Sequence, residues 1–365
     1  MMSELLLPSD KPIFVMEGRY GLPGQPLTET RTNVMPRKLA EEGITTLLID
    51  PKDPETFDKK GIRRGGVICR DEIVYNELPE SIVPDAWRLR DPVWEKGDPP
   101  AFVAQYGYNS AQARRELATN LGMLAALEAA GLADAIIPSV VVQDRQPLDN
   151  LPESPGGVLV KPSGKRSDVS EDPTLRAALV DERHALNVAI NHFGGNAIVQ
   201  PRLTTWAVDP LAGMFNLTLS QKGEYPPGSL HAIRVGGLLA REALDPSFVE
   251  FRATRATPTE NDIGKRFATE VRIFSPGNLF RRLPELAELH RRVHGALRNR
   301  FGELNNLAVD YIVGAGGERE IWVANVLARA LTPNLKQVDS RRIKLAKRTI
   351  DHEVDLIKRL VEQKF

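Results

Sequence analysis

Hydrophobic positions in the first hundred residues alternate between strand-like and helix-like patterns. The segments PIFVM (12–16), TTLLID (45–50) and GGVIC (65–69) are short and apolar with several β-branched residues, as buried strands are. NVMPRKLAEEG (33–43) follows the first of them and predicts a short helix that ends at Gly43. Strands that alternate with a helix indicate a small α/β subdomain with a parallel sheet.

One longer helix is predicted next. Ser110 is a suitable N-cap, Leu117, Leu121 and Leu124 recur on one helical face, and Gly131 marks the end.

Strand and turn patterns then dominate from about 136 to 242, with one helix at about 174–192. The segment 243–280 is charged and contains three prolines, so we expect an irregular loop that faces the substrate.

Two further helices complete the pattern. The first, over 284–302, begins with Pro284 in its first turn. The second covers about 338–362. Its apolar positions share one helical face: Ile343, Ile350, Val354, Ile357 and Val361.

Composition narrows the class of protein. A chain of 365 residues is long enough for two or three packed subdomains. Basic and acidic residues balance at 48 each, so no overall field favours nucleic acid or an anionic membrane. The single cysteine, Cys69, excludes an intramolecular disulfide, and no apolar run approaches the ~20 residues of a membrane span. We expect a cytoplasmic protein.

The segment GGVLVKPSGKRSDVS (156–170) is the first candidate for chemistry. It predicts a strand with Lys161 at its end, followed by a loop that starts at Ser163 and Gly164. A lysine fixed in this way reaches a nucleotide phosphate, while loop N–H groups and Lys165 bind other phosphates. The alternative is an exposed turn with solvated cations.

Two later segments carry polar residues in strand contexts. In NAIVQPRL (196–203), Gln200 ends a strand before a proline and offers a hinge to a purine edge, although a plain buried strand has the same pattern. In LHAIRVGGLLARE (230–242), a glycine pair predicts a hairpin turn between Arg234 and Arg241. Two such arginines suit a carboxylate or phosphate, or alternatively a cross-strand ion pair.

Asp310 and Asn325 lie on two predicted strands joined by a glycine-rich turn. Carboxylate and amide oxygens suit Mg²⁺. A single strand aspartate is also a common structural hydrogen-bonding residue, so both interpretations stay open. His290 and His294, one turn apart, lack the glutamate of a zinc protease, because Arg291 stands at its position, and predict a solvated helix face.

The order of these motifs, over roughly residues 12–335, resembles the ATP-grasp superfamily, nearer its glutathione-synthetase-like and D-alanine–D-alanine-ligase-like members than its carboxylases. The resemblance implies an α+β protein: an α/β N-terminal subdomain followed by an ATP-grasp fold of two α+β subdomains clasping ATP. The implied boundaries are 1–105 for the N-terminal subdomain, 106–150 for a helical linker region, 151–206 for the small subdomain, 207–336 for the large subdomain and 337–365 for the C-terminal helix.

The resemblance also implies roles for individual residues, with ATP and Mg²⁺ as cofactors. Nucleotide binding falls to Lys161, Ser163, Gly164, Lys165, Gln200, Leu203 and, in place of a second lysine, Arg115. Arg234 and Arg241 are the implied catalytic arginines. Asp310 and Asn325 are the implied metal ligands, and Arg252 and Arg255 the candidate substrate-binding pair.

One departure concerns the metal site. The family has a glutamate two residues before the asparagine, where this chain has Val323. Glu320, which lies three residues before Val323, is the substitute candidate for the missing acid.

The resemblance implies an ATP-dependent ligase that joins a small-molecule or peptide carboxylate to an amine through an acyl phosphate. Alternatives are a degenerate member that binds nucleotide or a partner without ligation, and a phosphotransferase. No nucleic acid or membrane partner is expected. ATP-grasp proteins are often dimers, which makes a homodimer the assembly to test.

Overall fold

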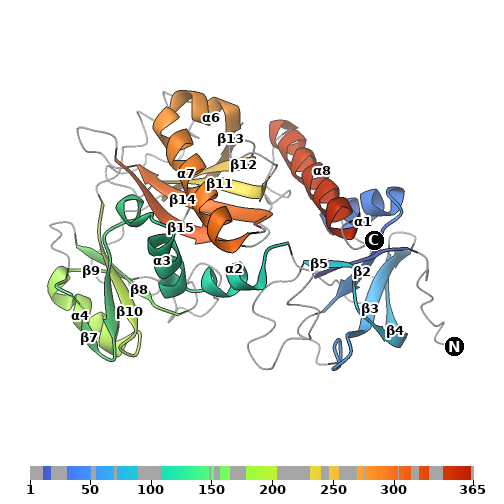
Figure 1. Cartoon of the computed structure of the whole chain (residues 1–365), viewed down its shortest axis with the longest axis horizontal. Helices are drawn as coiled ribbons and strands as arrows, with labels where there is room; N and C mark the ends of the chain where they lie inside the picture. The colour runs from blue at the N-terminus through green and yellow to red at the C-terminus, as the bar shows by residue number, and fades with distance from the viewer. Residues whose placement is uncertain are drawn as a thin grey trace.

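The described residues of the computed structural model form three five-stranded sheets (Figure 1). It describes residues 11–17, 31–50, 55–69, 72–88, 108–147, 149–151, 157–164, 178–203, 231–239, 246–254, 269–274, 276–302, 304–313, 320–328 and 340–362. None of its described helices is both long and apolar enough to cross a membrane.

The N-terminal sheet has the strand order β4-β3-β2-β1-β5. Its elements are β1 (Ile13–Glu17), α1 (Arg31–Glu41), β2 (Thr45–Ile49), β3 (Ile62–Cys69), β4 (Glu72–Ile82) and β5 (Ala86–Arg88). β1 is parallel to β2 and β5, but the β2–β3 and β3–β4 pairs are antiparallel. The prediction of a parallel sheet is therefore wrong for this edge. Only two residues separate β3 from β4, and a parallel pair needs a crossover of a dozen or more.

The small sheet has the order β7-β6-β10-β8-β9. Its elements are β6 (Val140–Gln143), β7 (Gln146–Pro147), β8 (Val158–Pro162), β9 (Ala178–Val180), α4 (Glu182–Asn191) and β10 (Ala197–Pro201). One face is apolar and packs with α4 through Val158, Val160, Ala197 and Val199. Residues on the other face are consequently turned away from α4.

The large sheet has the order β13-β12-β11-β14-β15. Its elements are β11 (His231–Leu239), β12 (Pro246–Thr254), β13 (Thr269–Phe274), α6 (Pro276–Arg282), α7 (Pro284–Phe301), β14 (Asn306–Val313) and β15 (Ile321–Leu327). The prediction of an irregular loop over 243–280 is wrong where β12, β13 and α6 form.

The predicted hairpin turn at Gly236 and Gly237 is also wrong. β11 continues through both glycines, because each stays paired with β14, opposite Ala308 and Leu307.

The single helix predicted after Ser110 is two helices, α2 (Ala111–Glu116) and α3 (Asn120–Ala129). Ser110 caps the first as expected, and the Thr119 side chain accepts a hydrogen bond from the Gly122 N–H to cap the second. Gly122 makes the break sterically feasible, since a Cβ there would lie 2.3 Å from the carbonyl oxygen of Glu116. The short helix η3 (Ala133–Ala135) follows.

The last helix, α8 (Ser340–Glu362), lies beside α1 and also contacts β11 and β12 of the large sheet (Figure 1). Its predicted apolar residues Ile350, Val354, Ile357 and Val361 are buried with β1 and α1. The hydroxyl of Tyr108 donates a 2.9 Å hydrogen bond to Glu353, which is fully buried. The C-terminal helix thereby joins the first sheet to the last; the domain boundaries themselves stay predictions.

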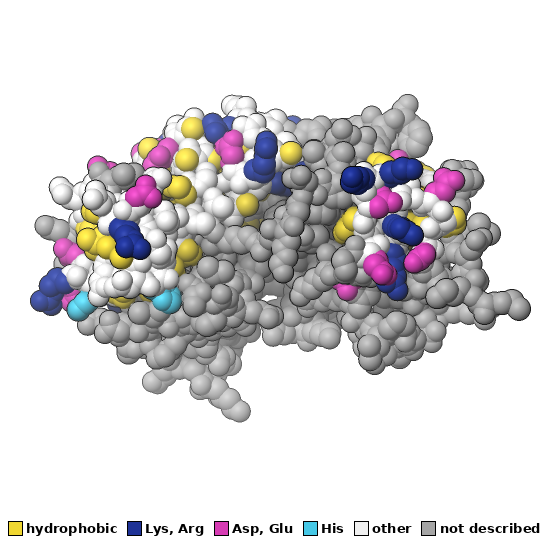
Figure 2. All heavy atoms as spheres, turned by 90° about the horizontal axis from the view of Figure 1, so that it is seen from below, with side chains coloured by type: hydrophobic (Ala, Val, Ile, Leu, Met, Phe, Trp, Pro, Cys, Tyr) yellow, Lys and Arg dark blue, Asp and Glu magenta, His cyan; other side chains and the backbone are white. Residues whose placement is uncertain are grey.

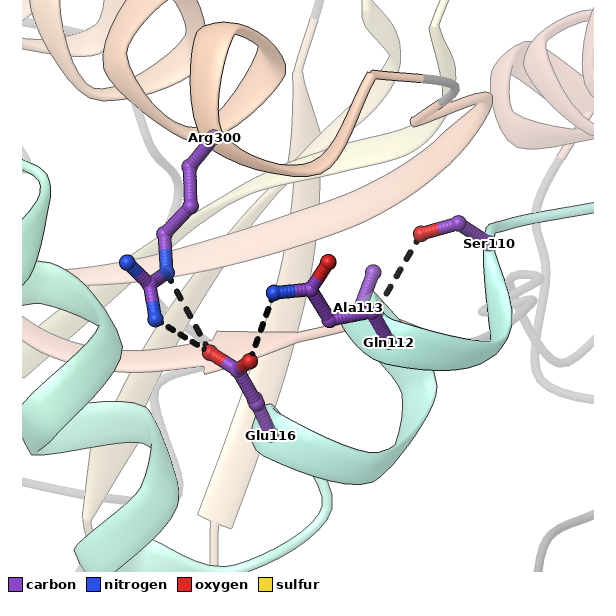
Figure 3. Close-up of polar contacts among 5 residues, drawn as sticks. All are labelled: Ser110, Gln112, Ala113, Glu116 and Arg300. Atoms are coloured by element: carbon purple, nitrogen blue, oxygen red, sulfur yellow. Dashed lines mark hydrogen bonds and ion pairs between the residues drawn. The ribbon is translucent and has the colours of Figure 1, made fainter.

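An ion pair connects α2 to α7 (Figure 3). Arg300 donates to Glu116 at 2.7 Å, and Gln112 donates to the same carboxylate at 2.8 Å. The Arg300 hydrogen bond, followed by that of Gln112, lowers the pKa of Glu116. The charged carboxylate is therefore the form that stabilises this junction.

Replacing Glu116 with Gln tests the contribution of this pair. Because the folded-state pKa is lowered, its stabilisation is present above the ordinary pKa and is lost as the pH falls through the folded-state value. We expect the variant to lose about 0.2–1 kcal/mol of unfolding free energy at pH 7, measured by urea denaturation, and the difference to vanish under acid conditions. Glu128→Gln on α3 is the control. An equal difference at neutral and acid pH would contradict the assignment.

Candidate metal and nucleotide site

At β14, one side of the large sheet packs against helices and the other side carries Asp310. Val309, Tyr311 and Val313 belong to the core that contains α3, α6 and α7. Asp310 alternates with them, so it points away from those helices. It is buried and accepts a 3.3 Å hydrogen bond from the Asn325 amide nitrogen. The sequence-predicted pair of oxygen donors therefore does meet, in direct register across β14 and β15.

A β-bulge separates this pair from position 323. Asp310 is opposite Asn325, but Tyr311 is opposite Val323, so Ala324 is an additional residue in β15. A bulge interrupts the regular alternation of side chains. Val323 and Asn325 therefore do not share a face, as regular alternation would have required.

Val323 is part of the hydrophobic core. It is 3% exposed, clusters with Tyr311 and forms an isolated bridge with Ile136. Position 323, where the resemblance implies a glutamate, therefore belongs to the core.

Two predicted nucleotide ligands share one face of the small sheet. Lys161 pairs with Ile198, and Gln200 pairs with Leu159, in the antiparallel register of β8 and β10. Their neighbours on the opposite face pack against α4. Lys161 is partly exposed and Gln200 is buried, so a cation and an amide lie on the side away from α4.

The end of β8 is held by the N-terminus of α3. The N–H groups of Asn120 and Leu121 donate to the carbonyls of Gly164 and Ser163 at 3.0 and 2.9 Å. The Asn120 side chain also donates to Pro162 at 2.8 Å. These bonds fix the residues that immediately follow Lys161.

The same contacts limit what the loop can bind. The Ser163 N–H donates to Asn196, so it is already engaged and is not the phosphate donor that was predicted. The Ser163 hydroxyl and the Gly164 N–H stay candidates.

Gln200 makes a specific contact with the segment that precedes β6. Its side-chain nitrogen donates to the Ser139 hydroxyl at 2.8 Å, and that hydroxyl donates to the carbonyl of Ile137 at 2.7 Å. The side-chain oxygen of Gln200 is buried and has no hydrogen-bond partner within the described part of the chain.

The remaining predicted residues are not brought together by described contacts. Arg115 is exposed on α2, Leu203 is half-buried after β10, and Glu320 is exposed just before β15. Arg234 is in register with Asp310, and Arg252 lies in β12, opposite Ala232. Three predicted site residues are outside the described residues: Lys165, Arg241 and Arg255.

The two histidines of α7 are not solvated, contrary to the prediction. His290 and His294 are 1% and 6% exposed, because the apolar face of α7 includes both positions. His290 hydrogen-bonds to the Tyr311 hydroxyl at 2.8 Å. Burial raises the pKa of Tyr311, and the charge of Asp310 raises it further, which keeps this hydroxyl protonated. Burial, with Arg298, lowers the pKa of His294.

On the surface shown in Figure 2, the acidic and basic side chains of described residues are interspersed. No single-sign patch collects on the described part of this face. The surface here is that of a protein with balanced charge.

No protein-family model matches the sequence, and no curated protein matches it significantly. Similar solved structures exist despite this. D-alanyl-alanine synthetase A from Vibrio cholerae O1 biovar eltor superposes with a TM-score of 0.52 at 9% identity, over 97% of this chain and 99% of that chain. The ATP-grasp ligase PsnB, complexed with a minimal precursor, gives 0.50 at 12% identity over 96% and 99%.

The chain has the ATP-grasp fold. This confirms the predicted α+β class.

In the ATP-grasp fold of this chain, the donor set fits one magnesium ion better than two. Asp310 and Asn325 both carry side-chain oxygens, and Mg²⁺ takes one or two protein carboxylates plus water and phosphate. Across the described residues, no group of three or more His, Cys, Asp or Glu side chains is arranged to hold a metal.

Sequence reasoning missed Ser139 and Asn120. Both have a recognisable signal, since Ser139 is the polar residue of the apolar run IIPSVVV and Asn120 directly follows the cap residue Thr119. Only the folded chain reveals which distant residues they contact.

Replacing Val323 with Glu tests the bulge. A carboxylate at this buried position enters the apolar core, so we expect the unfolding free energy to fall by roughly 3 kcal/mol or more. Val323→Ala, expected to cost roughly 1–3 kcal/mol, controls for lost packing. Urea denaturation measures both. A Glu variant as stable as the Ala variant, with tighter Mg²⁺ binding than the wild type, would show that residue 323 faces Asp310.

Proposed function

We propose that the protein is an ATP-dependent carboxylate–amine ligase that forms an amide or peptide bond through an acyl phosphate. The observation that carries the proposal is the pairing of Asp310 with Asn325 on the polar side of the large sheet of an ATP-grasp fold. Two similar structures are named a synthetase and a ligase, which supports the same class of reaction.

The small sheet supplies the nucleotide contacts in this proposal. Lys161, at the end of β8, neutralises phosphate charge, and the three hydrogen bonds from Asn120 and Leu121 keep the following residues in place. Gln200 and Leu203, at the end of β10, contact the base. Fixed positions matter because this chemistry depends mainly on orientation and charge neutralisation.

The large sheet holds the cation and the reacting groups. Asp310 and Asn325 provide oxygen ligands for Mg²⁺, which when bound neutralises phosphate charge. Arg234, in register with Asp310, and Arg241 bind the γ-phosphate and then the acyl phosphate through their guanidinium groups. Arg252 and Arg255 receive the substrate carboxylate.

The reaction has two steps. A carboxylate oxygen of the first substrate attacks the γ-phosphorus, and ADP leaves. The nitrogen of the amine then attacks the acyl carbon, loses a proton, and phosphate leaves. The substrates are a small-molecule or peptide carboxylate and an amine, the compartment is the cytoplasm, and the assembly to test is a homodimer.

The second candidate is an ATP-grasp protein that binds nucleotide or a partner without ligation. One observation favours it: with Val323 in the core, the described part of the site has Asp310 as its acid beside Asn325. With fewer carboxylate ligands from the protein, a second cation next to a triphosphate is bound more weakly.

Titration of MgATP into the protein by calorimetry tests nucleotide binding. We expect micromolar affinity in the wild type and a loss of about tenfold or more in Lys161→Ala, because a charge-assisted contact to phosphate is removed. Arg183→Ala is the matched control, since it removes an exposed cation from α4, on the other side of the small sheet. A wild-type protein that is folded but binds no nucleotide would refute the proposal.

ADP release in a screen of carboxylates and amines separates the two candidates. If the protein is a ligase, ADP release depends on both substrates. Asp310→Asn should then lower the rate of ADP release by at least about a hundredfold. Nucleotide binding without turnover for any pair would favour the second candidate.

A further inference from the structure

The contact between Gln200 and Ser139 determines how the Gln200 amide is oriented. An amide has a donor end and an acceptor end of nearly equal shape, so only its hydrogen-bond partners decide which end faces which way. The serine hydroxyl has one proton, and it is committed to the carbonyl of Ile137 at 2.7 Å. A carbonyl only accepts, so the proton cannot be used elsewhere.

Toward Gln200, the Ser139 oxygen therefore acts as an acceptor. The amide nitrogen must face Ser139, as the 2.8 Å contact records, and the amide oxygen must face the other way. The hydrogen bonds that link Gln200, Ser139 and Ile137 thus fix which end of the amide faces Ser139. Without them, the amide would be free to turn by 180°.

The oxygen that results is an acceptor in need of a donor. Gln200 is 6% exposed, and its side-chain oxygen is buried with no hydrogen-bond partner among the residues that the structure describes. Buried polar atoms without partners are rare and costly. The atom belongs to the side of the small sheet that also bears Lys161, away from α4.

We propose that Ser139 is a positioning residue that gives the base site its selectivity: it holds the Gln200 oxygen as an acceptor for an exocyclic amino group. A 6-aminopurine donates to this atom, whereas a 6-oxopurine presents a second acceptor and is rejected. This inference rests on the proposed nucleotide-binding function. Ser139 lies outside β10, the strand that carries Gln200.

A comparison of ATP with inosine 5′-triphosphate tests the inference, because the two nucleotides differ in the 6-substituent and the adjoining ring proton. Calorimetry gives the ratio of their dissociation constants. We expect the wild type to prefer ATP by about tenfold or more, since an unpaired buried acceptor has a penalty of this order. Ser139→Ala lets the amide turn, so the ratio should fall by about fivefold or more. Ser139→Thr keeps the hydroxyl and should restore the preference.

The same Ser139 substitution in a Gln200→Glu protein distinguishes orientation of the amide from simple structural support by Ser139. Gln200→Glu has two acceptor oxygens and no donor, so turning the side chain changes nothing. Adding Ser139→Ala to Gln200→Glu should therefore leave the ratio unchanged, although the same change lowers it in the glutamine background. Thermal denaturation of each variant checks that it is folded.

The outcomes are distinct. A wild type that binds ATP and inosine triphosphate equally, or a Ser139→Ala variant with an unchanged ratio, overturns the inference and leaves the proposed function standing. Equal effects of Ser139→Ala in both backgrounds also overturn it, because a role in local packing predicts that result. Failure of the folded wild type to bind either nucleotide overturns both proposals.

Discussion

One face of the large sheet is buried against α3, α6 and α7, and the position of the candidate site follows from that burial. Ile233, Val235, Val309 and Tyr311 fill the interface together with the apolar side of α7. Because side chains alternate along a strand, Asp310 lies on the opposite side. The antiparallel register places Asn325 beside it. The polar pair is placed by the hydrophobic core that lies behind it.

The bulge at Ala324 changes which side chains of β15 face the same core. Regular pleating would keep positions 323 and 325 on one side, as a ligand set with two acids requires. The extra residue instead gives Val323 to the core, where it contacts the segment around Ile136. A valine at position 323 suits this register, because a carboxylate there would be buried among apolar side chains.

The helix α3 joins the two halves of the site. Its apolar residues belong to the core of the large sheet, while its first N–H groups bind the backbone just after Lys161. Helix N-termini leave such donors available, and here the carbonyls of Ser163 and Gly164 satisfy them. The end of β8 that carries Lys161 is in this way held by an element that packs behind Asp310.

Local sequence determined several helix ends, one helix face and the strands that carry the candidate site residues. Capping by Ser110, the proline start of α7, the apolar stripe of α8 and the strands around Lys161, Gln200 and Asp310 all follow from residues within one turn or one strand. The motif order was enough to predict the ATP-grasp fold. These features depend on short-range periodicity and capping, which the chain carries in itself.

Tertiary structure decided the rest. The sequence does not reveal that Ser139 orients Gln200, that the glycine pair of β11 stays paired with β14, or that His290 is buried against Tyr311. It also implied that Val323 and Asn325 share a face, whereas the register assigns them to different ones. Register and burial are set by partners distant in the chain, because a strand takes its inner face from whatever packs against it.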